Sequence, residues 1–301
     1  MDHLQAIRIF ARVVETGSFT QASRSLAVPA ATVSKWVRSL EAHLGVKLLE
    51  RTTRRVTVTT DGAAYYERTR PLLSELDDVE ATLGQAQSNP RGALRIDTGS
   101  SVASGILVPA LPAFLARHPG LRVRLSVTDR NADLIADNID CSIRSSAMDL
   151  DLISQPIGAL RWTTCATPGW LADHGAPRHP RDIVERKLPV AGYFSATTGV
   201  VRPLEFRQRE ERITLSDDDV HHEVLVSDNG TLLAAALAGL GLVQTLDFIV
   251  RPAIVAGSLK PVLTDWQPDP VTVYAAYPPS RRFSTKVRVF VEWARCVFDG
   301  S

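Results

Sequence analysis

Cysteine is scarce in this chain of 301 residues, which contains three, at positions 141, 165 and 296. They are far apart and odd in number, so they predict neither a disulfide framework nor a CxxC-type metal site. Unpaired cysteines are typical of proteins from a reducing compartment, and we therefore expect a cytoplasmic protein. We expect no metal site and no cofactor.

Long hydrophobic runs are not evident either. We find no run of about 18 or more apolar residues, so we expect no membrane-spanning segment. The first residues, Met1-Asp2-His3-Leu4, lack a basic stretch followed by an apolar one, so we expect no signal peptide. With 45% hydrophobic and 22% charged residues, the composition is that of an ordinary globular protein, and the length suggests about two domains.

Motifs of common enzyme classes are absent as well. The sequence has no GxSxG, HExxH or P-loop motif. Gly239-Leu240-Gly241 begins like a dinucleotide-binding loop, but Leu242-Val243-Gln244 breaks that pattern. We therefore expect a protein that is not an enzyme.

Charge is distributed unevenly although the net charge is only +1. Residues 1–60 carry nine Lys and Arg against four Asp and Glu, whereas residues 61–90 carry two against six. A basic N-terminal region on an otherwise neutral chain is the asymmetry expected where one end meets phosphate groups.

Residues 1–60 have the pattern of three short helices. Gly17 ends the first helix, Ser18 caps the second with Gln21 as a capping-box partner, and Pro29 suits the start of the third. Ala27-Val28 leaves a tight turn between the second and third, which predicts a helix-turn-helix. The residues at helical spacing that we expect to face inward are Leu4, Ile7, Phe10, Ala11 and Val14 in the first helix and Ala22, Leu26, Val33, Val37 and Leu40 in the others.

Two further elements follow this region. Residues 56–59 are β-prone and come after Arg51, Arg54 and Arg55, which predicts a β-wing with cationic groups near its tip. Apolar residues then recur at alternating intervals of four and three residues. This spacing predicts a helix that pairs with another helix and kinks at Pro71. An amphipathic helix packed on its own chain is the alternative. The heptad residues are Tyr65, Thr69, Leu72, Leu76, Val79, Leu83 and Ala86.

From residue 93 onward, strand and helix patterns alternate, which predicts parallel sheets covered by helices. We expect strands at 94–96, 122–127, 140–144, 223–227, 242–245 and 271–276, and helices at 107–115, 133–137, 231–237 and 284–297.

The N-terminal motifs together resemble those of the LysR-type transcriptional regulators over residues 4–66. The resemblance rests on the helix-turn-helix at 22–41, on Leu44-Gly45-Val46-Lys47-Leu48-Leu49-Glu50-Arg51, and on the wing that leads to Thr59-Thr60-Asp61-Gly62. One difference is Pro29-Ala30-Ala31 where many relatives have Ser-Pro-Ser, so operator preference does not carry over.

A recognition helix needs short or polar residues where it enters the major groove. The expected DNA-binding residues are Ala30, Ala31, Thr32, Ser34, Lys35, Arg38, Arg54 and Arg55. Of these, Ser34 and Lys35 resemble the family's Ser-Arg pair and would contact phosphate or base edges. Arg38 would contact the backbone, and Arg54 or Arg55 would enter the minor groove. A solvated basic helix face is the alternative.

The C-terminal region resembles the family's effector-binding domain, which is similar to periplasmic solute-binding proteins. The expected fold class is α/β, with an N-terminal winged helix-turn-helix, a long linker helix and a C-terminal two-subdomain domain. The expected domains are 1–60 (DNA binding), 61–90 (linker and dimerisation helix) and 91–301 (effector binding), the last divided into subdomain I (91–161 and 267–301) and subdomain II (162–266).

Strand ends and helix N-termini line a cleft between such subdomains, and their free N–H groups favour anions. The expected effector-binding residues are Thr98, Ser100, Ser101, Arg144, Ser195, Thr197, Asn229 and Gln244. Helix capping is the alternative for Ser100 and Asn229, and a structural ion pair is the alternative for Arg144.

The sequence thus predicts a DNA-binding transcription regulator that responds to a small anionic or aromatic effector. The expected partners are double-stranded operator DNA, the effector and further copies of the chain in a homodimer or homotetramer. RNA polymerase is a further candidate partner, and a membrane is not. Two alternatives remain: a solute-binding or catalytic α/β protein with a helical adapter head, and an effector-independent DNA-binding regulator.

Overall fold

The computed structural model describes residues 2–51, 56–83, 90–128, 133–145 and 151–299. The chain divides into two compact units, Met1–Gln87 and Ser88–Ser301, and each is described by itself. We call them unit 1 and unit 2.

Unit 1 begins with three helices, α1 (His3–Thr16), α2 (Phe19–Leu26) and α3 (Ala30–Leu44). As the sequence predicts, Gly17 ends α1 in a left-handed conformation, with φ 62°, and the Ser18 side chain caps α2 by accepting a hydrogen bond from the Gln21 N–H. Ala27 also takes a left-handed conformation, with φ 53°, which turns the chain sharply between α2 and α3. The helix-turn-helix is therefore confirmed.

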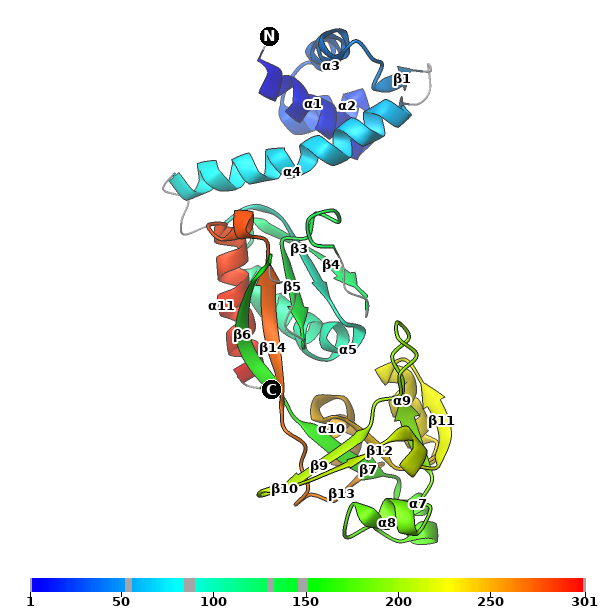
Figure 1. Ribbon diagram of the computed structural model, residues 1–301. Coiled ribbons are helices and arrows are strands. Elements are labelled where there is room, and N and C mark those ends of the chain that lie inside the picture. The colour runs from blue at the N-terminus through cyan, green and yellow to red at the C-terminus, as the bar shows by residue number, and fades with distance from the viewer. Residues whose placement is uncertain (1, 52–55, 84–89, 129–132, 146–150, 300–301) are drawn as a thin grey trace. The chain divides into compact units, whose positions relative to one another are not determined.

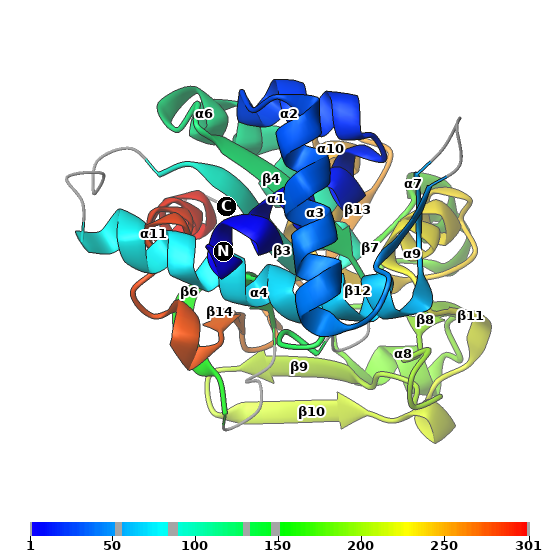
Figure 2. The same cartoon turned by 90° about the horizontal axis from the view of Figure 1, so that it is seen from above.

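The helices α1, α2 and α3 lie side by side (Figure 2), and their buried apolar residues form a single hydrophobic cluster. Ala22, Val33, Val37 and Leu40 are fully buried as predicted, whereas Leu26 is half-buried at its edge. The remaining buried members of this cluster are Ala6, Ile9, Phe10, Val13, Leu48 and Leu49.

The wing consists of β1 (Leu49–Arg51) and β2 (Val56–Val58), which pair antiparallel. The Glu41 carboxylate, on α3, accepts hydrogen bonds from the backbone N–H groups of Leu48 (3.0 Å) and Leu49 (3.1 Å). The wing is therefore fastened to α3 at its base. Its tip, including Arg54 and Arg55, lies outside the described residues.

The helix α4 (Thr60–Leu83) completes unit 1. It runs on past Pro71, with Thr69 buried and Leu72 64% exposed. The first heptad positions thus pack on the chain's own core, while Leu72 is open to solvent. The later heptad positions, Val79, Leu83 and Ala86, lie outside the part of the chain whose side chains are described.

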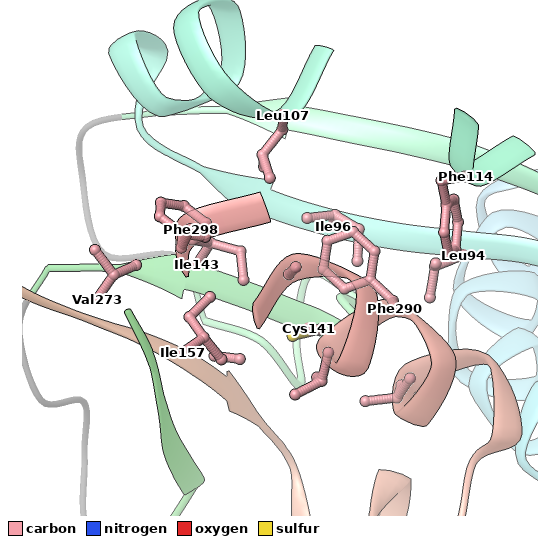
Figure 3. Close-up of a cluster of buried hydrophobic side chains, with 14 of the residues drawn as sticks. Leu94, Ile96, Leu107, Phe114, Cys141, Ile143, Ile157, Val273, Phe290 and Phe298 are labelled. Atoms are coloured by element: carbon pink, nitrogen blue, oxygen red, sulfur yellow. The ribbon is translucent and has the colours of Figure 1, made fainter. Parts of the chain in front are cut away.

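Unit 2 contains a five-stranded sheet of order β4-β3-β5-β14-β6 (Figure 1). The neighbouring strands β4, β3 and β5 run parallel, and β14 runs antiparallel to both β5 and β6. The helices α6 (Val108–Arg117) and α11 (Thr285–Asp299) contribute Phe114 and Phe290, which meet edge to face in the core (Figure 3). The strands are β3 (Gly92–Thr98), β4 (Leu121–Val127), β5 (Cys141–Arg144), β6 (Ile153–Leu160) and β14 (Val271–Tyr277).

A second lobe of unit 2 is built on the antiparallel sheet β12-β7-β13, with a parallel pair β8–β11 and a hairpin β9–β10 beside it. The strands are β7 (Trp162–Ala166), β8 (Val190–Tyr193), β9 (Leu204–Gln208), β10 (Glu211–Leu215), β11 (His222–Val226), β12 (Val243–Leu246) and β13 (Lys260–Val262). The helices are α7 (Pro168–His174), α8 (Arg181–Glu185), α9 (Asn229–Leu237) and α10 (Asp247–Val255).

The chain crosses between the two lobes of unit 2 twice. Arg161 alone separates β6 of the first lobe from β7 of the second, and the segment between β13 and β14 returns to the first lobe (Figure 1). The predicted parallel pairing is found for β4, β3 and β5 and for β8 and β11, but β14 and β6 run antiparallel to their neighbours and the sheet β12-β7-β13 is antiparallel throughout, so the prediction of parallel sheets is correct only in part. Residues 134–138 form a turn instead of the predicted helix: the Asp133 carboxylate accepts from the Ile135 and Ala136 N–H groups, and the left-handed conformation of Asn138, with φ 52°, ends the turn.

One segment bears on the expectation about hydrophobic runs. The window Ser100–Arg117, with mean hydropathy 1.3, is long and apolar enough to cross a membrane by length and composition alone. It comprises α5 (Ser100–Val102), a π-helical turn (Ala103–Leu107) and α6. Ile106, Leu107 and Phe114 belong to the core of the five-stranded sheet. Helices that pack on a sheet pass the same test, so the window is weak evidence for a membrane span.

Candidate functional site

The outer edge of α3 carries the predicted DNA-binding residues of unit 1. Ala30, Ala31, Lys35 and Arg38 are exposed, and Thr32 and Ser34 are half-buried. Because Val33, Val37 and Leu40 on the other side of the helix are fully buried, the residues of this edge must face outward. We call these six outward residues the α3 edge.

Ser34 and Arg38 are one helical turn apart and contact each other. The Arg38 guanidinium donates to the Ser34 hydroxyl and to the Ser34 carbonyl oxygen, both at 3.4 Å. Lys35, beside them, extends an ammonium group from an exposed position. The α3 edge thus offers two cations, Lys35 and Arg38, and two hydroxyls, those of Thr32 and Ser34, within about two turns of helix, which suits phosphate and base-edge contacts.

Unit 2 contains a cavity of about 370 Å³ that lies between its two lobes. From the first lobe, Ser100 and Ser101 of α5 and Ser104 and Gly105 of the π-helical turn line it. From the second lobe, the lining residues are Asp228, Gly230, Leu233, Phe248, Ile249 and Pro252. Two of the predicted effector-binding residues, Ser100 and Ser101, therefore meet the start of α9 and the start of α10.

Gly105 lets the two lobes approach each other at this cavity. A Cβ atom on Gly105 would lie 2.7 Å from the Phe248 ring, which is closer than carbon atoms approach. Single-turn π-helical segments are frequent at functional sites, and this one places both Ser104 and Gly105 on the cavity wall.

The polarity of the cavity is split between its two walls. The first-lobe wall carries the serine hydroxyls, whereas Leu233, Phe248 and Ile249 make the opposite wall largely apolar. The Asp228 carboxylate caps α9 by accepting from the Thr231 N–H at 2.7 Å. That capping already uses part of the positive potential at the α9 N-terminus. The cavity therefore suits a ligand with an apolar body and a polar group that meets the serines.

Thr98 and Gln244 are buried, and their side chains bond within the fold. Thr98 Oγ1 donates to the Ile143 carbonyl at 3.2 Å. The Gln244 amide donates to Thr164 Oγ1 and to the Glu205 carbonyl, and its oxygen accepts from the Glu205 N–H at 3.1 Å. Neither residue is among those that line the cavity with Ser100 and Ser101.

Arg144 forms an ion pair with Asp97 inside the first lobe. This is the structural ion pair that the sequence leaves open as the alternative to effector binding by Arg144. Both side chains are buried, with 8% and 0% exposure. The Arg144 guanidinium also donates to Ser142 Oγ at 3.2 Å and to the Thr128 carbonyl at 2.7 Å. These contacts hold the carboxyl ends of β3, β4 and β5 together.

Ser195, Thr197 and Asn229 lie in the second lobe and are not among the residues that line the cavity, although Asn229 stands between two residues that do, Asp228 and Gly230. Ser195 begins an exposed loop, in which its hydroxyl accepts from the Thr198 N–H at 3.3 Å, and Thr197 is exposed on the same loop. Asn229 is the first residue of α9, but the side chain that caps this helix is Asp228.

Sequence reasoning missed the apolar wall of the cavity. Phe248 and Ile249 lie in the first turn of α10, and they line the cavity through a long-range contact between α10 and the π-helical turn of the first lobe, which has no local signal in the sequence. The pattern Ser227-Asp228-Asn229-Gly230-Thr231 did signal the other contribution, the N-terminus of α9. Among the described residues, no group of three His, Cys, Asp or Glu side chains is placed to hold a metal ion.

Two domain families match this chain, and together the matches cover most of it. Residues 4–63 match the bacterial regulatory helix-turn-helix protein, lysR family, and residues 87–299 match the LysR substrate binding domain. The first match covers the helix-turn-helix and the wing, and the second covers the unit that contains the cavity.

Individual relatives agree with these matches. An HTH-type transcriptional repressor of Pseudomonas aeruginosa is 36% identical over 300 residues, with 99% of this chain and 93% of the relative covered. The HTH-type transcriptional activator AaeR of Escherichia coli is 33% identical, with 97% and 92% covered. Among solved structures, CrgA, a LysR-type transcriptional regulator from Neisseria meningitidis, is 27% identical with a TM-score of 0.60 and 97% of each chain covered. The chain belongs to the family of LysR-type transcriptional regulators.

Proposed function

We propose that the α3 edge is the surface through which this regulator reads its operator, with Lys35 and Arg38 as the principal cationic contacts. The observation that carries this proposal is the exposure of Lys35 on a helix whose opposite face is fully buried. Such a helix presents its polar edge to the major groove without rearrangement. Arg54 and Arg55, outside the described residues, stay proposed minor-groove contacts of the wing.

Replacing Lys35 by alanine is expected to weaken DNA binding and to reduce its dependence on salt. Each neutralised phosphate releases condensed counterions, so the slope of log Kobs against log salt concentration should fall by about one. Fluorescence anisotropy with a labelled fragment from upstream of the protein's own gene measures both quantities over a series of salt concentrations.

The matched control is Lys260→Ala, which removes the same charge from an exposed position on β13 of unit 2. The Lys260→Ala chain should bind DNA with the same affinity and the same salt slope as the unmodified chain. An unchanged slope for Lys35→Ala would show that Lys35 contacts no phosphate.

We further propose that the effector occupies the cavity between the lobes of unit 2, with its apolar body against Phe248 and Leu233 and a polar group at Ser100 and Ser101. The cavity supports this because residues of both lobes line it. A ligand that contacts both lobes changes their relative preference for open and closed arrangements, and through linkage it changes the affinity for DNA. Thr98, Arg144 and Gln244 are left out of this site because their polar groups bond within the fold.

Removing the Ser101 hydroxyl is expected to weaken effector binding by a few-fold to about tenfold, because one hydrogen bond usually contributes that much to the affinity. A thermal-shift screen of metabolites on the unmodified chain selects the compound, and titration calorimetry with Ser101→Ala gives the change in Kd. Ser126→Ala, which removes a hydroxyl from an exposed position on β4, is the control. Equal affinities of the Ser101→Ala and unmodified chains would remove Ser101 from the site.

We propose that the chain acts in the cytoplasm as a homodimer or a dimer of dimers paired through α4, on which Leu72 is 64% exposed. An apolar side chain so exposed on a heptad position supports a helix partner. Sedimentation equilibrium is expected to give two or four times the chain mass of 32.9 kDa.

A further inference from the structure

The side chain of Phe248 joins the two lobes of unit 2. Phe248 belongs to the first turn of α10 in the second lobe, yet it packs against the hydrophobic cluster of the five-stranded sheet in the first lobe. Leu246, at the end of β12, packs against the same cluster. The lobes are therefore held together by apolar packing as well as by the two chain crossings.

The Phe248 ring lies against Gly105 of the first lobe. A Cβ atom on Gly105 would be 2.7 Å from Cε2 and 2.8 Å from Cδ2 of the ring, which is closer than a Cβ atom approaches other atoms in proteins. Apolar contacts weaken steeply when even a small gap opens between the atoms. Any side chain at position 105 would therefore displace the ring or separate the lobes.

The backbone at position 105 does not itself call for glycine. Gly105 lies in the π-helical turn Ala103–Leu107 and is not among the residues with positive φ. Alanine is the better helix former at such a position. The close approach of Phe248 is thus the feature of the structure that requires glycine here, and π-helical turns are frequent at functional sites.

This contact also borders the cavity between the lobes. Ser104 and Gly105 line the cavity from the first lobe, and Phe248 and Ile249 line it from the second. Separation of the lobes at Phe248 would therefore change the width of the cavity. A ligand that fills the cavity would in turn act on the contact between Phe248 and Gly105.

We propose that Phe248 and Gly105 form a latch that holds the lobes in this approached arrangement and sets its balance with an open one. The latch makes its apolar contacts only while the lobes are together, so it stabilises that arrangement alone. The inference rests on the proposed effector cavity and names what regulates it. Its test needs no effector.

The test measures hydrogen–deuterium exchange of backbone amides in the full chain without a ligand. Gly105→Ala is expected to accelerate exchange in residues 100–107 and in α10 by about tenfold or more, because both segments lose their contact across the lobes. If the Phe248 ring merely turns aside, alanine strengthens the helix and exchange in residues 100–107 slows instead. Slower or unchanged exchange overturns the proposal.

A second variant tests the other side of the latch. Phe248→Leu, which keeps an apolar side chain but removes the ring, should accelerate exchange in residues 100–107 of the opposite lobe. Combining it with Gly105→Ala should add little, because the latch is already broken by either change. An effect of the double variant equal to the product of the single effects shows that the two residues act independently, and it overturns the proposal.

The matched control is Gly169→Ala, which adds the same methyl group to α7 of the second lobe. No atom lies within 4 Å of where this Cβ would be. Exchange in residues 100–107 and in α10 should equal that of the unmodified chain. Circular dichroism of every variant shows that the chain is folded.

Anisotropy with operator DNA on the same preparations separates the latch from the proposed function. We expect Gly105→Ala and Phe248→Leu to change operator affinity in the same direction, because the arrangement of the lobes is linked to DNA binding. If exchange rises and operator affinity stays constant, the latch stands and that linkage fails. If exchange does not rise but Lys35→Ala still weakens DNA binding, the proposed reading edge stands and the latch fails.

Discussion

Replacing Gly62 by alanine is expected to unfold unit 1 and to abolish DNA binding. A Cβ atom on Gly62 would lie 2.0 Å from the Leu48 carbonyl oxygen and 2.8 Å from its carbonyl carbon. That oxygen accepts a hydrogen bond from the Thr59 N–H at 3.0 Å, so moving it breaks the junction between the wing and α4. Because the overlap is with backbone, we expect a loss of about 3 kcal/mol or more in the free energy of unfolding of unit 1.

The control for this prediction is Gly45→Ala. Gly45 has φ +72°, and no atom lies within 4 Å of where its Cβ would be, so the added methyl group meets only conformational strain of about 1–2 kcal/mol. Thermal melts followed by circular dichroism, together with gel shifts, measure both effects. Wild-type melting and DNA affinity in Gly62→Ala would contradict the packing described for this junction.

Replacing Arg144 by methionine is expected to destabilise unit 2 by about 3–5 kcal/mol, the usual result of leaving a buried charge without its partner. Asp97 is fully buried, and its carboxylate contacts Ser142 Oγ at 3.1 Å in addition to Arg144. Denaturant unfolding of the single variant measures the loss.

A second variant distinguishes this structural role from a role in binding the effector. Adding Asp97→Asn to Arg144→Met removes the unpaired charge, so the double variant should recover part of the lost stability. If Arg144→Met instead leaves stability within about 0.5 kcal/mol of the unmodified chain and only weakens ligand binding, Arg144 acts on the effector.

The helix-turn-helix could be predicted from the sequence because its determinants are local. The Ser18 cap, the left-handed Gly17 and the helical spacing of Val33, Val37 and Leu40 each act within a few residues. The wing strand at 56–58 was likewise visible from its β-prone residues, but the Glu41 contacts that hold its base join positions seven and eight residues apart and have no local signature.

The candidate effector site depended on contacts that the sequence does not display. The strand ends and helix starts were located well enough to place Ser100 and Ser101 on the cavity. The sequence left open whether Arg144 faces a ligand or a partner, because Asp97 lies 47 residues away. The contact that brings Phe248 of α10 to the first lobe likewise joins residues far apart in the sequence.

The base of the wing has a mechanical consequence for the regulator. Glu41 joins α3 to β1, the Leu48 carbonyl joins that segment to Thr59, and the Thr59 hydroxyl in turn accepts from the Gly62 N–H at 2.9 Å in the first turn of α4. These hydrogen bonds couple α3 to the first turn of α4. We therefore expect that a rotation of α4 about its axis would carry the α3 edge, the proposed DNA-binding surface, with it.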